Sequence, residues 1–306
     1  MDLSIDIATV TSVLRAFFEG SSADTVFVGG VPNPDGHLDW IDEMLTRSEP
    51  HDPDYRIFGK LRDPSSTIID VGAHYGYSAA SIWAVGSTTC VLSFEPTEAI
   101  GPMLDRIAEL RPGRFDYRVI ALGLRLGQLD LVVPVLDGVG LTALTTGIGH
   151  PDIAAMAHSI ATYASAHGGE RLTMYRFTAP MGRLDGVLAK GGFRVPTDKI
   201  VAIKVDAEEM EADVLDGARA TIKRHLPLVM AESGHNPRPR AVMEEMGFKM
   251  AELSPSGDML LETAMPTLAV NGWFFHPSKQ AEYQAAGILA ESSNVGLSPS
   301  VGAPGG

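Results

Sequence analysis

The chain has 306 residues, of which 45% are hydrophobic and 20% charged, a composition typical of a folded globular protein. Its formal net charge of −14 argues against non-specific binding to nucleic acid, because an acidic surface repels phosphates. Cys90 is the single cysteine, which excludes an internal disulfide framework and a zinc site built from cysteines.

The first residues, Met1–Asp6, are acidic and lack the charged-then-apolar order of a secretory signal. No apolar run in the chain approaches the roughly 18 residues that are needed to span a bilayer. We therefore expect a soluble cytoplasmic protein with neither a membrane nor a nucleic acid as its partner.

Residues 1–62 are predicted to form a separate extension of helices and turns. The extension opens with apolar residues at helical spacing, namely Ile7, Val10, Val13, Leu14, Phe17 and Phe18. A turn-rich segment follows at 29–36, and a second helix is expected at about 38–45. An extension of this kind suits either a cap on the main domain or a contact between copies, so a homo-oligomer formed through residues 1–62 is one expectation.

Residues 63–280 are predicted to form the main domain, because short apolar runs alternate there with helical patterns. The apolar runs cover residues 67–71, 89–94, 115–120, 200–205 and 228–231. The helical patterns cover residues 78–85, 100–107 and 210–222. Runs this continuous are typical of strands buried on both faces. The alternation predicts a doubly wound, mostly parallel α/β sheet of the Rossmann type, with ligands at the carboxyl ends of its strands.

Two segments depart from this rhythm. Residues 138–170 contain a helical stripe flanked by glycines, formed by Ile153, Met156, Ala157, Ile160 and Ala164. This pattern predicts a helix inserted between the third and fourth parallel strands, either as a lid over the substrate or as a packing insertion. Residues 281–306 are rich in Ser, Gly, Pro and Ala and are expected to form a loose tail.

The most informative motif lies where the first predicted strand ends and the first helix begins. It reads Asp70, Val71, Gly72, Ala73, His74, Tyr75 and Gly76. The glycines permit a tight turn and let a ligand approach the backbone closely. Glu95, followed by Pro96, ends the second predicted strand 19 positions after Gly76. That spacing is typical of the acid that accepts hydrogen bonds from ribose hydroxyls.

A nucleoside cofactor is therefore expected at Asp70, at Gly72–Gly76 and at Glu95 and Pro96. NAD carries a pyrophosphate, which usually sits at a helix start behind a G-x-G-x-x-G loop. This chain has G-x-x-x-G instead, with Asp70 directly before it, and a carboxylate would repel a pyrophosphate. S-adenosylmethionine has no phosphate and carries an ammonium and a sulfonium group, so the charge argument favours S-adenosylmethionine.

At this point the sequence resembles the FkbM family of methyltransferases. The resemblance rests on the cofactor loop and on four further motifs, which are Phe94-Glu95-Pro96, Leu184-Asp185, the stretch from Lys204 to Gly217, and Val229-Met230-Ala231-Glu232. These motifs occur in the family's order over about residues 65–235. His74 stands where the family more often has Asn, and Glu209 replaces the usual Gly.

The resemblance implies the Rossmann-like class I methyltransferase fold and O-methylation of a small molecule, often a sugar or a secondary metabolite. If the family's glycine position demands a positive φ, Glu209 is either strained or sits in a rearranged turn. The resemblance does not extend to the first 60 residues.

Removal of the acceptor's hydroxyl proton needs a base at the carboxyl end of a strand, beside the methyl group. Asp206 closes the fourth predicted strand and is the leading candidate, Glu208 follows on the same loop, and Glu232 closes the fifth strand. Glu211 is expected instead to favour the start of a helix. The three candidates could together bind Mg²⁺, but nothing in their spacing requires it, so no metal is expected.

Two alternatives remain open at the level of the sequence. One is an NAD-dependent oxidoreductase. Such a protein would bind NAD and would not bind the methyl donor. The other is a non-catalytic module that keeps the cofactor fold, and Glu209 in place of Gly is the feature that keeps this reading open.

Overall fold

A computed structural model describes residues 6–19, 41–148, 152–232, 236–264 and 271–291 of the chain. Its larger sheet has eight strands in the order β12-β11-β13-β10-β9-β1-β2-β3. Five neighbouring strands are parallel, namely β3 (Phe115–Val119), β2 (Cys90–Glu95), β1 (Thr67–Val71), β9 (Ile200–Val205) and β10 (Leu228–Glu232). Three antiparallel strands extend the sheet beyond β10, namely β13 (Asn271–Phe275), β11 (Lys249–Leu253) and β12 (Leu260–Glu262). The prediction of a mostly parallel sheet is confirmed.

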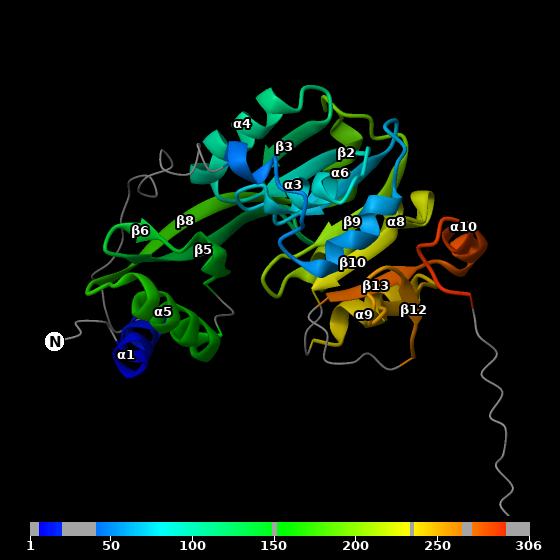
Figure 1. Cartoon of the computed structure of the whole chain (residues 1–306). Coiled ribbons are helices and arrows are strands. Elements are labelled where there is room, and N and C mark those ends of the chain that lie inside the picture. The colour runs from blue at the N-terminus through cyan, green and yellow to red at the C-terminus, as the bar shows by residue number, and fades with distance from the viewer. Residues whose placement is uncertain (1–5, 20–40, 149–151, 233–235, 265–270, 292–306) are drawn as a thin grey trace, which may run out of the picture.

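Helices cover both faces of this sheet, as a doubly wound fold requires (Figure 1). One face carries η1 (Pro53–Lys60), α3 (Tyr77–Ala84), η2 (Glu98–Ile100) and α4 (Gly101–Leu110). The other face carries α6 (Leu184–Lys190), α7 (Glu211–Gly217), α8 (Arg219–His225) and α9 (Arg238–Glu245). Strand β1 supplies Ile68 to the first core and Ile69 and Val71 to the second, because successive strand residues point to opposite faces.

A second, smaller sheet projects from the main body (Figure 1). Its strands are β4 (Ala121–Leu122), β8 (Leu172–Gly182), β5 (Gly127–Leu136) and β6 (Val139–Gly140), and β7 (Thr146–Gly147) also pairs with β5. Helices α1 (Ile7–Phe18) and α5 (Ile153–His167) pack against each other, and together with this sheet they form a third core. The predicted inserted helix is confirmed as α5. The long antiparallel pairing of β5 with β8, the strands before and after this helix, was not predicted.

The predicted limits of the outer segments need correction. Residues 1–62 are not one extension, because α1 joins the small sheet whereas Ile41, Tyr55 and Phe58 lie in the main core. The expected second helix is seen over residues 41–44, and the turn-rich segment 29–36 lies outside the described residues.

The first part of the expected loose tail, residues 281–291, is folded, and residues 292–306 lie outside the described residues. Helix α10 (Gln280–Ala285) follows η4 (Pro277–Lys279), and the buried Leu289 forms a β-bridge with Leu260. Residues 281–291 therefore belong to the main domain, since they bury apolar side chains on it. Among the described residues, no helix has the length and apolarity to cross a membrane.

Candidate active site

The loop after β1 turns sharply and passes close to the loop after β9. Gly72 and Gly76 have φ values of +78° and +85°, in the left-handed region that glycine adopts without strain. A Cβ on Gly72 would lie 1.8 Å from the carbonyl oxygen of Asp206. The glycine at position 72 is therefore required for the two loops to touch.

Glu95, at the carboxyl end of β2, ties this loop to the next one. Its two carboxylate oxygens accept hydrogen bonds at 2.9 Å from the backbone N–H groups of His74 and Thr97. Burial raises the pKa of Glu95, and the hydrogen bonds from Thr97 and His74 oppose this effect. Two carboxylate oxygens offer about four acceptor positions, so Glu95 keeps capacity for further donors.

A cavity of about 190 Å³ lies at the carboxyl ends of β1, β2 and β9. Its walls come from the loop after β1, the end of β2, the segment Ile120–Leu122, the loop after β9 and the small sheet. Six of the predicted site residues line it, namely Gly72, His74, Glu95, Pro96, Asp206 and Glu208.

The other predicted cofactor residues are not among those that line the cavity, so their contact with a cofactor stays a prediction. Ala73 is fully buried in the main core. Gly76 is the N-cap of α3, and a Cβ on it would lie 2.1 Å from Ile107 Cδ1. The Tyr75 hydroxyl accepts a hydrogen bond from Thr142 of the small sheet at 2.8 Å. The contacts of these three residues fix the shape of the loop.

Asp70 is also not among the residues that line the cavity. Its side chain is fully buried, accepts a hydrogen bond from the Ser93 hydroxyl at 2.8 Å and lies 3.3 Å from Lys204 Nζ. The charge of Asp70 is therefore matched inside the protein and does not face the cavity.

Two acidic side chains at the ends of neighbouring strands form a pair. Burial and the negative charge of Asp206 raise the pKa of Glu232 to about 8. Burial opposes ionisation of Asp206, but the charge of Lys204 and a hydrogen bond from Glu232 outweigh it and lower the pKa of Asp206. At neutral pH the shared proton therefore lies on Glu232, and Asp206, which lines the cavity, is ionised.

Glu208 lies on the same loop and also lines the cavity. Burial, followed by the negative charges of Asp206 and Glu211, raises its pKa to about 7. Two of the three predicted catalytic carboxylates thus face the cavity. Glu232 is not among the lining residues and acts on the site through Asp206.

The small sheet contributes residues that the sequence patterns did not reveal. Thr142, Thr145 and Thr146 line the cavity, and the Thr142 hydroxyl lies 2.7 Å from His74 Nε2. No local pattern marks these threonines, because they lie in and just before β7 and reach the cavity only through the fold of the small sheet.

Among the described residues, no group of three or more His, Cys, Asp or Glu side chains is arranged to hold a metal ion. His235, which follows Glu232 closely in the sequence, lies outside the described residues.

A sequence model of the FkbM methyltransferase domain matches residues 70–254, which is more than half of the chain. The chain belongs to the FkbM methyltransferase domain family. None of the curated proteins compared with it matches.

Solved structures similar to this FkbM domain include a methyltransferase FkbM from Methylobacillus flagellatus KT, with 13% identity and a TM-score of 0.41. That match covers 79% of this chain, and the chain spans 59% of the other protein's length. Another is a precorrin-6y C5,15-methyltransferase from Geobacter metallireducens GS-15, with 8% identity, a TM-score of 0.33, and coverage of 72% and 85% of the two chains. The family assignment depends on the sequence match and not on these distant likenesses.

Two motifs of the FkbM resemblance have structural roles in this chain. The Asp185 carboxylate accepts hydrogen bonds from the backbone N–H groups of Ala220 and Thr221, which belong to the first turn of α8. The Glu211 carboxylate accepts one from the Ala207 N–H at 2.9 Å, so it supports the start of α7 as expected.

Glu209, which replaces the family's usual glycine, has a φ of +71°. We expect Glu209→Gly to raise the free energy of unfolding by about 1 kcal/mol, because a left-handed backbone costs a non-glycine residue roughly 1–2 kcal/mol. Urea unfolding measures this change. Glu209→Ala is the matched control, since it removes the same charge and keeps the strained φ. Equal stability of the two variants would contradict the strain argument.

Proposed function

We propose that this FkbM domain transfers a methyl group from S-adenosylmethionine to a hydroxyl group of a small molecule. The observation that supports it best is the charge of the cavity wall. The described lining residues include the carboxylates of Glu95, Asp206 and Glu208 and no Lys or Arg. Such a wall favours a cofactor with sulfonium and ammonium groups and disfavours the pyrophosphate of NAD.

The cavity also suits the nucleoside part of this cofactor. Glu95 has acceptor capacity left for a ribose diol, and Gly72 and His74 of the glycine loop line the cavity beside it. Apolar side chains for an adenine ring come from Phe94, Pro96 and the segment Ile120–Leu122. The charge argument first made for Asp70 is thus applied here to Glu95, Asp206 and Glu208, which line the cavity.

Asp206 is the proposed base. When bound, S-adenosylmethionine supplies a methyl group that its sulfonium centre already activates, so the protein mainly aligns the partners and excludes water. The acceptor oxygen bonds to the methyl carbon as the carbon–sulfur bond breaks, and the hydroxyl proton passes to Asp206. A weakly basic carboxylate suffices, because that proton becomes strongly acidic once the oxygen carries the methyl group.

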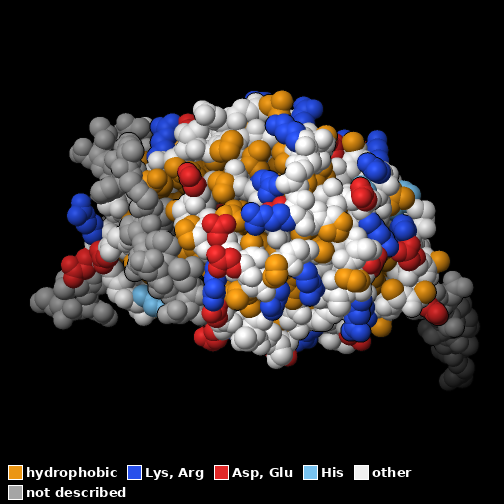
Figure 2. Space-filling model, turned by 90° about the horizontal axis from the view of Figure 1, so that it is seen from above, with side chains coloured by type: hydrophobic (Ala, Val, Ile, Leu, Met, Phe, Trp, Pro, Cys, Tyr) orange, Lys and Arg blue, Asp and Glu red, His pale blue; other side chains and the backbone are white. Residues whose placement is uncertain are grey.

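The acceptor is proposed to be a small molecule, since the cavity measures about 190 Å³ and residues of the small sheet form one of its walls. On the face seen in Figure 2, Lys and Arg side chains are interspersed with Asp and Glu among the described residues. This mixture gives nucleic acid no continuous basic surface on that face. A cytoplasmic location and a homo-oligomer through residues 1–62 stay predictions.

The proposal is tested by calorimetry of the purified protein with S-adenosylmethionine and with NAD. We expect a binding signal with S-adenosylmethionine and none with NAD. The reverse result would point to an oxidoreductase. Release of S-adenosylhomocysteine in the presence of hydroxylated metabolites then separates an enzyme from a non-catalytic module, which would bind the cofactor without turnover.

The pH dependence of kcat/KM distinguishes the three carboxylates as bases. Because the pKa of Asp206 is lowered, we expect kcat/KM to stay high as the pH falls below neutrality. A rise centred near pH 7 would assign the base to Glu208, whose pKa is about 7. A rise centred near pH 8 would assign it to Glu232, whose pKa is about 8.

A further inference from the structure

Lys204 is a buried lysine in the middle of the central sheet. Its side chain is 2% exposed. In the sheet, Lys204 lies beside Asp70 of β1 on one side and Met230 of β10 on the other. Burying an ammonium group is costly unless charges and hydrogen bonds compensate it. The sequence signal for it is a single charged residue inside the apolar strand Ile200–Val205.

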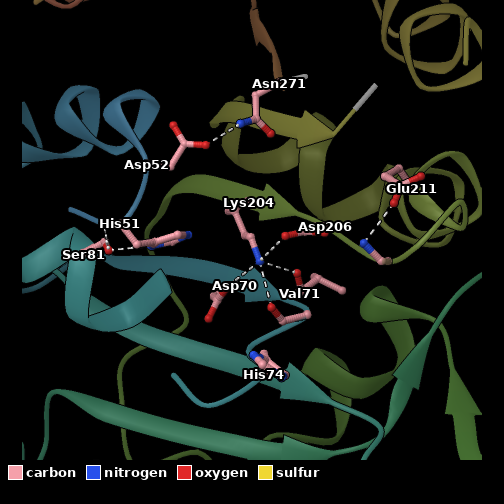
Figure 3. A network of polar contacts seen from close by, with 12 residues as sticks. His51, Asp52, Asp70, Val71, His74, Ser81, Lys204, Asp206, Glu211 and Asn271 are labelled. Atoms are coloured by element: carbon pink, nitrogen blue, oxygen red, sulfur yellow. Dashed lines mark hydrogen bonds and ion pairs between the residues drawn. The ribbon is translucent and has the colours of Figure 1, made fainter. Parts of the chain in front are cut away.

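The ammonium group binds the end of β1 and the start of the cofactor loop. Lys204 Nζ donates hydrogen bonds to the carbonyl oxygens of Val71 at 3.1 Å and Gly72 at 2.8 Å. It also lies 3.3 Å from Asp70 Oδ1 and 3.6 Å from Asp206 Oδ2. Asp70 and Asp206 lie on opposite sides of it, as Figure 3 shows.

Asp206 is joined to the same atoms through its backbone. Its N–H donates to the carbonyl oxygen of Val71 at 3.1 Å, the same oxygen that Lys204 binds. Its own carbonyl oxygen packs against Gly72, where a Cβ would not fit. Asp206 therefore cannot shift without also moving the start of the cofactor loop.

The charges of Glu208 and Glu211 work against the negative charge of Asp206, whereas a hydrogen bond from Glu232 supports it. Glu208 and Glu211 face it from its own loop and the start of α7, Glu232 from β10, and His51 from the segment before η1. Burial and the charge of Lys204 lower the pKa of His51, so His51 is neutral near pH 7. Lys204 is therefore the positively charged group among the described neighbours of Asp206 named here.

We propose that Lys204 is a positioning residue for methyl transfer: it keeps Asp206 ionised and holds it against the cofactor loop without touching either substrate. This proposal rests on the proposed function, in which Asp206 is the base. Lys204 does not line the cavity, so its effect passes through Asp206 and through the carbonyl groups of Val71 and Gly72.

The test compares the double variant Asp70→Asn/Lys204→Met with Asp70→Asn alone. Removing Lys204 by itself would leave Asp70 buried and unpaired, which is strongly destabilising, whereas removing both charges is far less costly. Asp70→Asn is the reference, because Lys204 still faces Asp206 in it. S-adenosylmethionine affinity, kcat and the pH profile of kcat/KM are measured for both variants.

Loss of Lys204 is expected to move the acidic limb of kcat/KM up by about one pH unit or more, since a neighbouring opposite charge lowers a carboxylate pKa by about 1–3 units. Activity lost on the acidic side is then regained as the pH rises. An acidic limb at the same pH in both variants would overturn the proposal. Wild-type protein that neither binds S-adenosylmethionine nor turns over would instead refute the proposed function.

A measurement on the wild-type protein keeps the inference testable if the double variant does not fold. Carbon-13 NMR of labelled aspartate carboxyl groups, with Asp206 assigned through Asp206→Asn, follows its titration without any activity. We expect a midpoint below the usual aspartate value of about 3.9. A midpoint at or above that value would show that Lys204 does not keep Asp206 ionised.

Discussion

Asp206→Asn is expected to lower the kcat of methyl transfer by about 10²- to 10⁴-fold, which is the usual contribution of a positioned general base. Asparagine has nearly the same shape but cannot take the hydroxyl proton. Lys204 keeps Asp70 and two backbone carbonyl groups as partners, so the fold should persist. Affinity for S-adenosylmethionine is expected to change far less than kcat, since the proposed cofactor contacts lie at the loops after β1 and β2 and the cavity wall keeps the carboxylates of Glu95 and Glu208.

The matched control for this variant is Asp198→Asn. Asp198 is exposed and lies just before β9, at the opposite end of the strand from Asp206. It should keep the wild-type kcat. Full activity of Asp206→Asn, measured as S-adenosylhomocysteine released per unit time, would remove Asp206 from the role of base.

Glu95→Ala is expected to weaken S-adenosylmethionine binding by about 10- to 100-fold. Hydrogen bonds to a charged group contribute about 1.5–3 kcal/mol, and the ribose would lose its acceptor. The substitution also leaves the N–H groups of His74 and Thr97 without the carboxylate that now accepts from both. The cofactor loop should therefore become less ordered as well, and the variant should unfold at a lower temperature.

Calorimetry measures this loss of affinity, and Glu98→Ala is its control. Glu98 is exposed, lies three residues after Glu95 and is not among the residues that line the cavity. Unchanged affinity in Glu95→Ala would remove Glu95 from the ribose contact. If the variant melts at a lower temperature but keeps its affinity, Glu95 only joins the loop after β1 to the loop after β2.

The central parallel strands β1, β2, β9 and β10 were predictable because they are short, largely apolar runs whose residues are nearly all buried. The expected strands at 67–71 and 200–205 coincide with β1 and β9, and all five residues of β1 are buried. The ends of these strands were predictable for the same reason. Since parallel strands end at one edge of a sheet, Glu95 and Asp206 were expected near the same ligand.

The small sheet was not predictable from the same patterns. In β8 (Leu172–Gly182), buried residues alternate irregularly with exposed ones, and its partner β5 lies far away in the sequence. The predicted helix at 210–222 is likewise divided into α7 and α8 at Gly217, where a Cβ would lie 2.3 Å from the carbonyl oxygen of Gly123. Contacts of this kind depend on chain segments that no local pattern connects.

The sequence by itself determined the central parallel sheet, the glycine loop after its first strand and the acids at the strand ends. Each of these follows from local hydrophobicity, from backbone freedom or from spacing along the chain. Only the tertiary structure decided which acids face the cavity. Asp70 does not, because pairing of β1 with β9 places the Lys204 ammonium group against it, and Asp206 does, because it lies one residue beyond that pairing.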